Sequence, residues 1–310
     1  MSLKSHQLSK LKPSISVLMP VYNADKHLHE AIESILTQTF SNFEFIIIND
    51  GSTDKSESIL QAYQKQDERI KLISRRNKGL TASLNEGLSY AQGQYIARMD
   101  ADDIAFPERF AKQVTFLENN PDHVAVGCRM LVIDPEGMPI FTCSKLTTHA
   151  EIDAAYMAGQ AGVIGHPAVM IRHHTLQSIN GYREAMEPCE DRDLFLRLAE
   201  VGKLANLPDI LLKYRLHPKS VGHTRRLVQK QKGNLATIEA HQRRGLEPPI
   251  LSDSSSEPPK SISDLHRQWT WWALGSGNVA TARKHGILAL TRQPLAVESW
   301  KVFACAMRGW

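Results

Sequence analysis

The sequence predicts an α/β fold in which helices cover both faces of a mainly parallel sheet, followed by a helical region at the carboxyl terminus. Two observations support this prediction. Over the first hundred or so residues, short apolar runs alternate with segments of helical spacing about every 25 to 30 residues, which is typical of βαβ units. Polar residues follow the apolar runs directly, and ligands of parallel sheets bind beyond the carboxyl ends of the strands.

Four short apolar runs, bounded by turn residues, predict buried strands in the first part of the chain. They lie at residues 15–19, 43–48, 70–74 and 95–99. Apolar residues at helical spacing predict three helices between these strands. The helices are the segment after Asn23, the segment that Thr53 or Asp54 would cap, and residues 80–91.

Beyond residue 105 the pattern is less regular. Helices are expected at 110–117 and 191–199, and strands at 124–126, 130–133, 169–171 and, at a sheet edge, 211–216. Residues 225–244 are helical in spacing and basic, residues 248–263 form a Ser- and Pro-rich linker, and helical spacing returns over 266–310. We therefore divide the chain into residues 1–105, 106–222 and 223–310.

The composition excludes several classes of protein. The chain has 310 residues, of which 42% are hydrophobic, and 37 Lys and Arg against 33 Asp and Glu give a net charge of +4, as in ordinary globular proteins. Its four cysteines are far apart, so neither a zinc cage nor a disulfide framework is expected. Residues 1–14 lack the apolar core of a signal peptide, and the apolar runs fall short of the roughly 20 residues that a membrane span needs. We expect a cytoplasmic protein that at most lies on a membrane surface.

Three carboxylates, Asp100, Asp102 and Asp103, follow the fourth predicted strand directly. Charges this close repel one another unless a cation or hydrogen-bond donors offset them. Because alternate residues of an extended segment point the same way, Asp100 and Asp102 are expected to face one pocket. Oxygen ligands suit Mg²⁺ or Mn²⁺. A solvated acidic turn that caps the helix after Pro107 explains the same residues, and a D-x-D pattern alone does not decide between the two.

Several motifs, taken in order, resemble the family 2 glycosyltransferases, which are inverting enzymes with a GT-A fold. They are SVLMPVYN (16–23), FIIINDGSTD (45–54), NKGLTASLNEGLSYAQGQYIARMDADD (77–103), the pair Glu190-Asp191, and YRLHPKSVG (214–222). The resemblance implies a Rossmann-like, nucleotide-diphospho-sugar transferase fold with a mixed, mainly parallel sheet. It also implies that residues 1–105 bind the nucleotide sugar and that residues 106–222 form the acceptor-binding and catalytic half of the same domain.

On the nucleotide side, the resemblance assigns a hydrogen bond from the base to the Asp50 carboxylate, and an aromatic face to Tyr22. Lys78 is expected near the diphosphate, although a solvated lysine is equally consistent with the sequence. For Asp50 the alternative is a turn-forming residue before Gly51, since Asp-Gly favours turns on its own. The full set of residues expected to contact the nucleotide sugar is Pro20, Tyr22, Asn23, Asp50, Lys78, Asp100 and Ala101.

The resemblance also assigns the metal ligands. It implies that Asp102 binds Mn²⁺ or Mg²⁺ directly, that His217 is a further ligand, and that Asp100 reaches the ribose or a metal-bound water. Imidazole suits Mn²⁺ better than Mg²⁺. Asp103 is expected to be structural and to cap the next helix.

Sugar transfer by single displacement needs a carboxylate that takes the proton of the acceptor hydroxyl, while the metal stabilises the charge on the leaving phosphate. The resemblance assigns Asp191 as this base and Glu190 as the neighbour that orients the acceptor or the base. Alternatively, both acids merely favour the positive end of a helix. His166 is expected to shape the acceptor pocket.

The carboxyl-terminal region is expected to contact a membrane. Between residues 213 and 244, nine basic residues stand against one acid, which gives a local charge of +8. This stretch and the Trp-rich helices, with Trp269, Trp271 and Trp272, suit docking on an anionic membrane surface. A solvated helix face and a subunit contact are the alternatives. No nucleic-acid fold signature accompanies the charge, so nucleic acid is not an expected partner.

The sequence as a whole predicts a metal-dependent inverting glycosyltransferase. The expected donor is a nucleotide-diphosphate sugar, with UDP as the nucleotide, and the expected acceptor is a saccharide or lipid-linked saccharide in cell-surface polysaccharide biosynthesis. A sugar-nucleotide nucleotidyltransferase would need a Gly-rich basic loop after the first strand, and PVYNAD (20–25) is not one. A catalytically inactive carbohydrate-binding or scaffolding module would lack the base or the D-x-D, and both are present. No G-x-G-x-x-G follows a predicted strand, which argues against a dinucleotide-dependent oxidoreductase.

Overall fold

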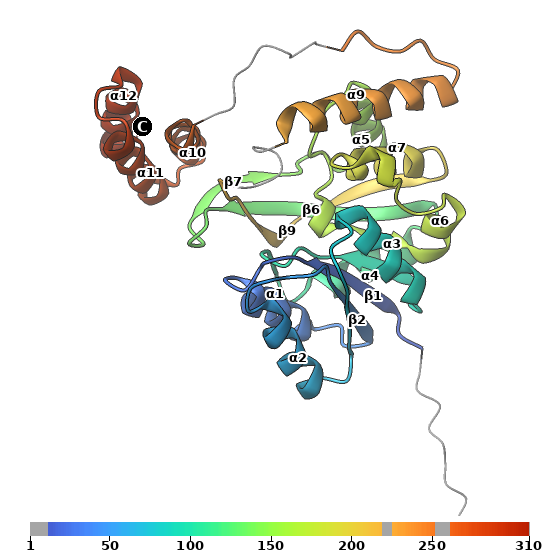
Figure 1. The fold of residues 1–310 in the computed structure, drawn as a ribbon. Coiled ribbons are helices and arrows are strands. Elements are labelled where there is room, and N and C mark those ends of the chain that lie inside the picture. Colours follow the sequence, from blue (N-terminus) through green and yellow to red (C-terminus); the bar gives the residue numbers. More distant parts are fainter. Residues whose placement is uncertain (1–11, 219–224, 252–260, 310) are drawn as a thin grey trace, which may run out of the picture.

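The computed structural model describes residues 12–218, 225–251 and 261–309 of the chain (Figure 1). Over these residues the chain builds one nine-stranded sheet with helices on both faces. In sheet order the strands are β3 (Ile70–Ser74), β2 (Phe43–Asn49), β1 (Ile15–Val21), β4 (Tyr95–Arg98), β8 (Met170–Arg172), β6 (His123–Ile133), β9 (Lys203–Arg215) and β5 (Ile104–Ala105), and β7 (Pro139–Cys143) pairs with β6.

The sheet changes character at β4. Strands β3, β2, β1 and β4 are all parallel, so their carboxyl ends meet at one edge. Beyond β4 the sheet is mixed, because β8 runs antiparallel to both β4 and β6, while β9 is parallel to β6. This arrangement confirms the predicted mixed, mainly parallel sheet, and it places the polar ends of the first four strands beside the second half of the chain.

Helices cover the two faces because successive side chains of a strand point to opposite sides. Val17 and Met19 of β1 pack on one side with three helices, and Leu18 packs on the other. The helices of the first side are α1 (Leu28–Leu36), α2 (Ser56–Gln66) and α4 (Arg109–Asn119). Those of the second side are α3 (Leu80–Tyr90), α5 (His149–Met157), α6 (His173–Ser178), α7 (Glu190–Ala199) and α9 (Arg226–Arg243).

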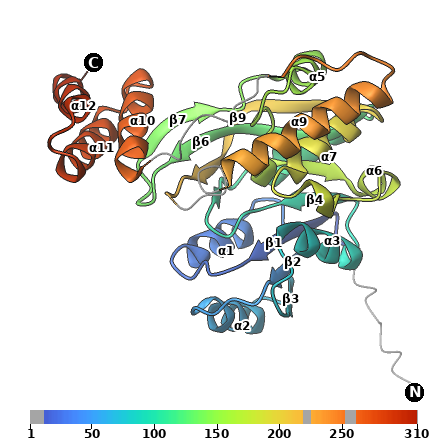
Figure 2. The same cartoon turned by 45° about the horizontal axis from the view of Figure 1, so that its top comes forward.

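Three further helices stand at one end of the molecule, beside the β6–β7 hairpin, as both views show (Figures 1 and 2). They are α10 (Ile262–Gly275), α11 (Val279–Arg292) and α12 (Val297–Arg308). Trp269 of α10 is fully buried and belongs to a cluster with Val132 and Ile140 of the hairpin. The buried carboxylate of Asp134, at the end of β6, accepts hydrogen bonds from Lys284 and His285 of α11. The helices are therefore fixed to the sheet through a small core and a buried ion pair.

Some predicted elements differ from the structure. The strands expected at 124–126 and 130–133 are one strand, β6, whose register against β9 shifts near Cys128 and Arg129. The strand expected at an edge over 211–216 is the end of β9, which lies inside the sheet because β5 pairs beyond it. Helix α2 has Lys55 at its N-cap, so neither Thr53 nor Asp54 takes that position.

The linker expected over 248–263 lies partly outside the described residues, which omit 252–260. At its end, Ser261 caps α10 in a reciprocal capping box with Asp264. A similar box, formed by Thr148 and Glu151, starts α5, a helix that the sequence did not predict. Among the described residues, none of the helices is both long enough and apolar enough to span a bilayer.

Trp269→Ala is expected to lower the free energy of unfolding by about 3–5 kcal/mol, because it leaves a large cavity in the cluster that fixes α10 to the hairpin. Urea unfolding measures this change. Trp271→Ala on the same helix is the matched control, since its side chain is 41% exposed and its loss should cost below about 1 kcal/mol. Equal losses in the two variants would contradict this packing.

Candidate active site

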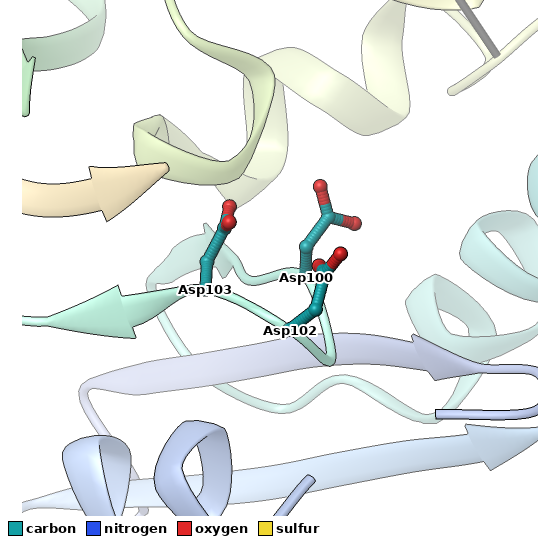
Figure 3. A group of neighbouring side chains, drawn as sticks. All are labelled: Asp100, Asp102 and Asp103. Atoms are coloured by element: carbon teal, nitrogen blue, oxygen red, sulfur yellow. The ribbon is translucent and has the colours of Figure 1, made fainter. Parts of the chain in front are cut away.

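The carboxylates that follow β4 lie on a tight turn rather than on an extended segment. The chain reverses at Ala101 and Asp102 and re-enters the sheet as β5. Oxygen atoms of Asp100, Asp102 and Asp103 thereby lie within 4.8 Å of one another. Figure 3 shows the three side chains pointing to the same side of the turn. Asp100 and Asp102 therefore converge as predicted. The reason given for it, an extended segment, was wrong, because a turn brings them together.

Each of these carboxylates has a partner from its own chain. Asp100 forms an ion pair with Arg98, a β4 residue that is 3% exposed. Asp102 Oδ2 lies 2.7 Å from His217 Nε2, so the structure brings the two predicted metal ligands together. Asp103 is fully buried, and its Oδ1 accepts a hydrogen bond from the backbone N–H of Arg215 at 2.8 Å.

The prediction that Asp103 caps the next helix is wrong. Helix α4 has Glu108 at its N-cap, and the two-residue strand β5 comes between Asp103 and that helix. Instead, the bond from Arg215 ties Asp103 to the end of β9. Because His217 lies just beyond this bond, Asp103 helps to place His217 beside Asp102.

A second acidic pair, Glu190 and Asp191, starts helix α7. Glu190 is 5% exposed, whereas Asp191 is partly exposed and accepts a hydrogen bond from the backbone N–H of Arg192. The pKa of Asp100 is raised by burial, then by the charge of Asp102 and, to a smaller extent, by the charge of Asp191. The acids that begin α7 therefore lie within electrostatic reach of the turn after β4. The two predicted groups of acids are therefore close enough for their charges to interact.

On the nucleotide side, Asp50 at the end of β2 is almost fully buried. Its carboxylate pairs with Arg75 and accepts hydrogen bonds from the backbone N–H groups of Lys78 and Gly79, at 2.7 and 2.9 Å. The adjacent Gly51 has a φ of +75°, and a Cβ there would lie 2.7 Å from the backbone nitrogen of Asn77. Asp50 therefore holds the loop that leads into α3, in addition to any contact with a base.

The remaining residues predicted to contact the nucleotide sugar differ in how far their side chains are exposed. Asn23 joins two strand-end loops, since its Oδ1 accepts a hydrogen bond from the backbone N–H of Thr53 at 2.8 Å. Tyr22 is 55% exposed, and Lys78 is exposed as well. The side chain of Ala101 is buried in the core under the turn. Pro20 is half-buried within β1. Tyr22 thus offers an exposed aromatic face and Lys78 an exposed cation.

His166 is buried, and its Nε2 shares a hydrogen bond with the Tyr182 hydroxyl at 3.0 Å. Its Nδ1 lies 4.0 Å from Glu190 Oε1. Burial holds the pKa of His166 well below its usual value, so the imidazole is neutral. His166 therefore lies beside Glu190 in the interior and not at an open surface.

Comparisons with known proteins agree with this geometry. Residues 16–150 match the family model described as glycosyl transferase family 2. The chain is 39% identical over 208 residues to the putative glycosyltransferase EpsE of Bacillus subtilis. The aligned region covers 66% of this chain and 73% of EpsE. The chain belongs to glycosyltransferase family 2. The predicted family and enzyme class are therefore confirmed.

Other relatives of this glycosyltransferase include the amylovoran biosynthesis glycosyltransferase AmsE of Erwinia amylovora, with 32% identity over 64% of this chain and 75% of AmsE. Among solved structures, Staphylococcus aureus TarS 1–349 in complex with UDP superimposes with a TM-score of 0.58 and 17% identity, over 96% of this chain and 92% of that one. A Pyrobaculum calidifontis mannosyltransferase in complex with GDP-Man and Mn²⁺ gives a TM-score of 0.58 and 18% identity, over 97% of this chain and 86% of the other. These likenesses confirm the predicted GT-A fold.

The turn after β4 suits a divalent cation. Three carboxylates and one imidazole form an oxygen-rich donor set with a single nitrogen, which favours Mn²⁺ and is tolerable for Mg²⁺. Two buried oxygen atoms in this region, Asp103 Oδ2 and Glu190 Oε2, have no hydrogen-bond partner among the described residues. Burial and then the charges of Asp102 and Asp100 raise the pKa of Asp103, so the site favours the protonated form of this carboxyl unless a positive charge binds nearby.

Sequence reasoning missed two residues of this glycosyltransferase's site. Arg98 interrupts the apolar run YIARM, and a charge in a predicted buried strand was the signal that could have found it. Glu187 Oε2 accepts a hydrogen bond from the backbone N–H of Thr81 at 3.1 Å, which joins the loop before α7 to the start of α3. No local pattern marks Glu187, because its partner is distant in the sequence.

Glu190→Gln should stabilise this glycosyltransferase progressively as the pH rises. Burial and then the charge of Asp191 raise the pKa of Glu190 from 4.5 to about 8. Between these values the unfolded chain has released the proton that the folded chain still binds, so the wild type loses stability with rising pH. The difference in unfolding free energy between variant and wild type should grow by up to about 1.4 kcal/mol per pH unit from pH 5 to 8. Urea unfolding in EDTA measures it.

Glu184→Gln, which changes an exposed acid in the segment before α7, is the control and should show no such trend. A pH-independent difference for Glu190→Gln would show that Glu190 ionises normally in the folded protein.

Proposed function

We propose that this enzyme transfers a sugar, with inversion, from a nucleotide-diphosphate sugar to a saccharide or lipid-linked saccharide acceptor in polysaccharide biosynthesis. The observation that carries the proposal is the pair of Asp102 and His217, 2.7 Å apart, within electrostatic reach of the acids that begin α7. The names of relatives add support, since AmsE acts in amylovoran biosynthesis. Structural neighbours bind UDP or UDP-GlcNAc in TarS and GDP-Man in the mannosyltransferase, which supports a nucleotide-diphosphate sugar as donor.

The donor would bind across the carboxyl ends of β1, β2 and β4. Tyr22 offers an exposed aromatic face, and Lys78, in the loop held by Asp50, offers an exposed cation for a diphosphate. Asp102 and His217 would hold Mn²⁺ or Mg²⁺, with Asp100 close enough to contact the ion or a ribose hydroxyl. Such a cation stabilises the negative charge that develops on a leaving diphosphate.

The acids of α7 would act on the acceptor. In the proposed step the acceptor oxygen bonds to the anomeric carbon, the bond from that carbon to the diphosphate breaks, and the electron pair leaves with the diphosphate. The acceptor proton moves to the Asp191 carboxylate, which is partly exposed. Burial raises the pKa of Asp191 and brings it closer to the operating pH, which suits a general base. Glu190, protonated near neutral pH, is placed to donate a hydrogen bond and orient the acceptor.

Asp191→Asn should lower kcat at least about a hundredfold while changing the KM for the donor only a few-fold, because the amide cannot accept the proton. The measurement is release of UDP from UDP-sugars, with acceptor present, in Mn²⁺ and in EDTA. EDTA should abolish release, and added Mn²⁺ should restore it. Asp209→Asn, a partly exposed acid on β9, is the control and should keep full activity.

Two outcomes would contradict this function. Undiminished turnover of Asp191→Asn would remove Asp191 as the base. Binding of UDP-sugar without any turnover by the wild type would favour the alternative of a carbohydrate-binding module.

We also propose that the enzyme docks on an anionic membrane, through α12 rather than through the basic helix α9. Several cations of α9 and its flanks pair with acids of the same chain, including Arg243 with Glu200 and Arg244 with Asp153. Helix α12 is the outermost of the three terminal helices (Figures 1 and 2). It carries an exposed stripe at helical spacing. The stripe consists of Val297, Trp300, Ala304 and Met307, and exposed Lys301 and Arg308 flank it.

The double variant Val297→Ser, Trp300→Ser should reduce binding to vesicles rich in phosphatidylglycerol at least about tenfold, because the stripe supplies the apolar contact. Vesicle sedimentation measures this, with phosphatidylcholine vesicles for comparison. Val201→Ser, which changes an exposed valine after α7, is the matched control and should bind like the wild type. The docking proposal would be overturned if the wild type were a dimer that did not bind vesicles and the double variant were a monomer.

A further inference from the structure

Arg98 is an unusual residue to find beneath a group of acids. It lies on β4, two residues before Asp100, and its side chain is 4% exposed. The guanidinium pairs with Asp100, while its Nε has no hydrogen-bond partner among the described residues. An arginine keeps its charge under all ordinary conditions, so this is a permanent positive charge inside the site.

The charge of Arg98 acts on both groups of acids. Arg98 pairs with Asp100 of the turn, and it opposes the rise that burial causes in the pKa values of Glu190 and Asp191 at the start of α7. The same guanidinium therefore partly neutralises acids of the turn after β4 and acids of α7.

The other two partners of these carboxylates, His217 and the backbone N–H of Arg215, are compatible with a bound cation, whereas Arg98 is not. The imidazole of His217 is itself a metal ligand type, and the backbone N–H of Arg215 occupies only Oδ1 of Asp103. Arg98 cannot coordinate a metal, and its charge repels one. A divalent ion at the turn must therefore bind against a fixed positive charge.

We propose that Arg98 is the resident counter-ion of the carboxylates after β4 and makes binding of the divalent cation depend on the nucleotide diphosphate. This inference rests on the proposed function. Without nucleotide, Arg98 offsets Asp100 and weakens cation binding. When the diphosphate is present, its negative charges offset Arg98 and its oxygens supply further ligands, so the cation binds with the nucleotide and not before it.

The test is direct binding of Mn²⁺, followed by the electron paramagnetic resonance signal of the free ion, with and without UDP and, in a parallel series, GDP. Wild-type protein should bind Mn²⁺ at least about tenfold more tightly with nucleotide than without. Arg98→Gln should bind Mn²⁺ at least about tenfold more tightly than wild type without nucleotide, and the difference should shrink to a few-fold with it. Arg98→Lys, which keeps the charge, should resemble wild type.

Arg197→Gln is the matched control. Arg197 is also a buried arginine, paired with Asp193 on α7 and bonded to the backbone of Ile179 and Gly181. Its loss should leave Mn²⁺ binding as in wild type, both with and without nucleotide, whatever it does to thermal stability.

Three results would overturn the inference. Equal Mn²⁺ affinity of the wild type with and without nucleotide would do so even if Arg98→Gln failed to fold. Equal affinities of Arg98→Gln and wild type without nucleotide would show that Arg98 is only structural. Absence of Mn²⁺ binding in all variants, with either nucleotide, would remove the metal from the proposed function and the inference with it.

Discussion

Several carboxylates lie close together in this fold, and their mutual repulsion must be offset by other groups of the same chain. Asp100, Asp102 and Asp103 crowd one turn, and the acids of α7 lie within electrostatic reach. Arg98, His217 and the backbone of Arg215 each offset one carboxylate of the turn. Arg98 lies on β4, Arg215 ends β9 and His217 follows it, so the charge balance requires both halves of the sheet to be in place.

The architecture explains why these groups meet. The first four strands are parallel and end at one edge, which supplies the turn after β4. The change to a mixed sheet at β8 lets the second half of the chain return to that edge through β9 and through the start of α7. The hydrogen bond between Glu187 and Thr81 fixes α7 and α3 to each other. The terminal helices pack on the β6–β7 hairpin, at one end of the molecule (Figure 2).

Local pattern predicted the first half well, because β1 to β4 are short apolar runs bounded by turn residues. It failed where long-range pairing decides the outcome: β5 is only two residues long, and β9 is interior because of it. The contact between Asp102 and His217 spans 115 positions and was expected only through the resemblance to a family. The partner of Asp103 could not be predicted from spacing, since a turn and not an extended segment sets its direction.

The most direct test of the account is the anomalous scattering of manganese in crystals grown with Mn²⁺ and a nucleotide diphosphate. The manganese peak is expected beside the carboxylate of Asp102 and Nε2 of His217, which would hold the ion, with Asp191 facing the open side of the site. A peak elsewhere, with the hydrogen bond between Asp102 and His217 still intact, would contradict it.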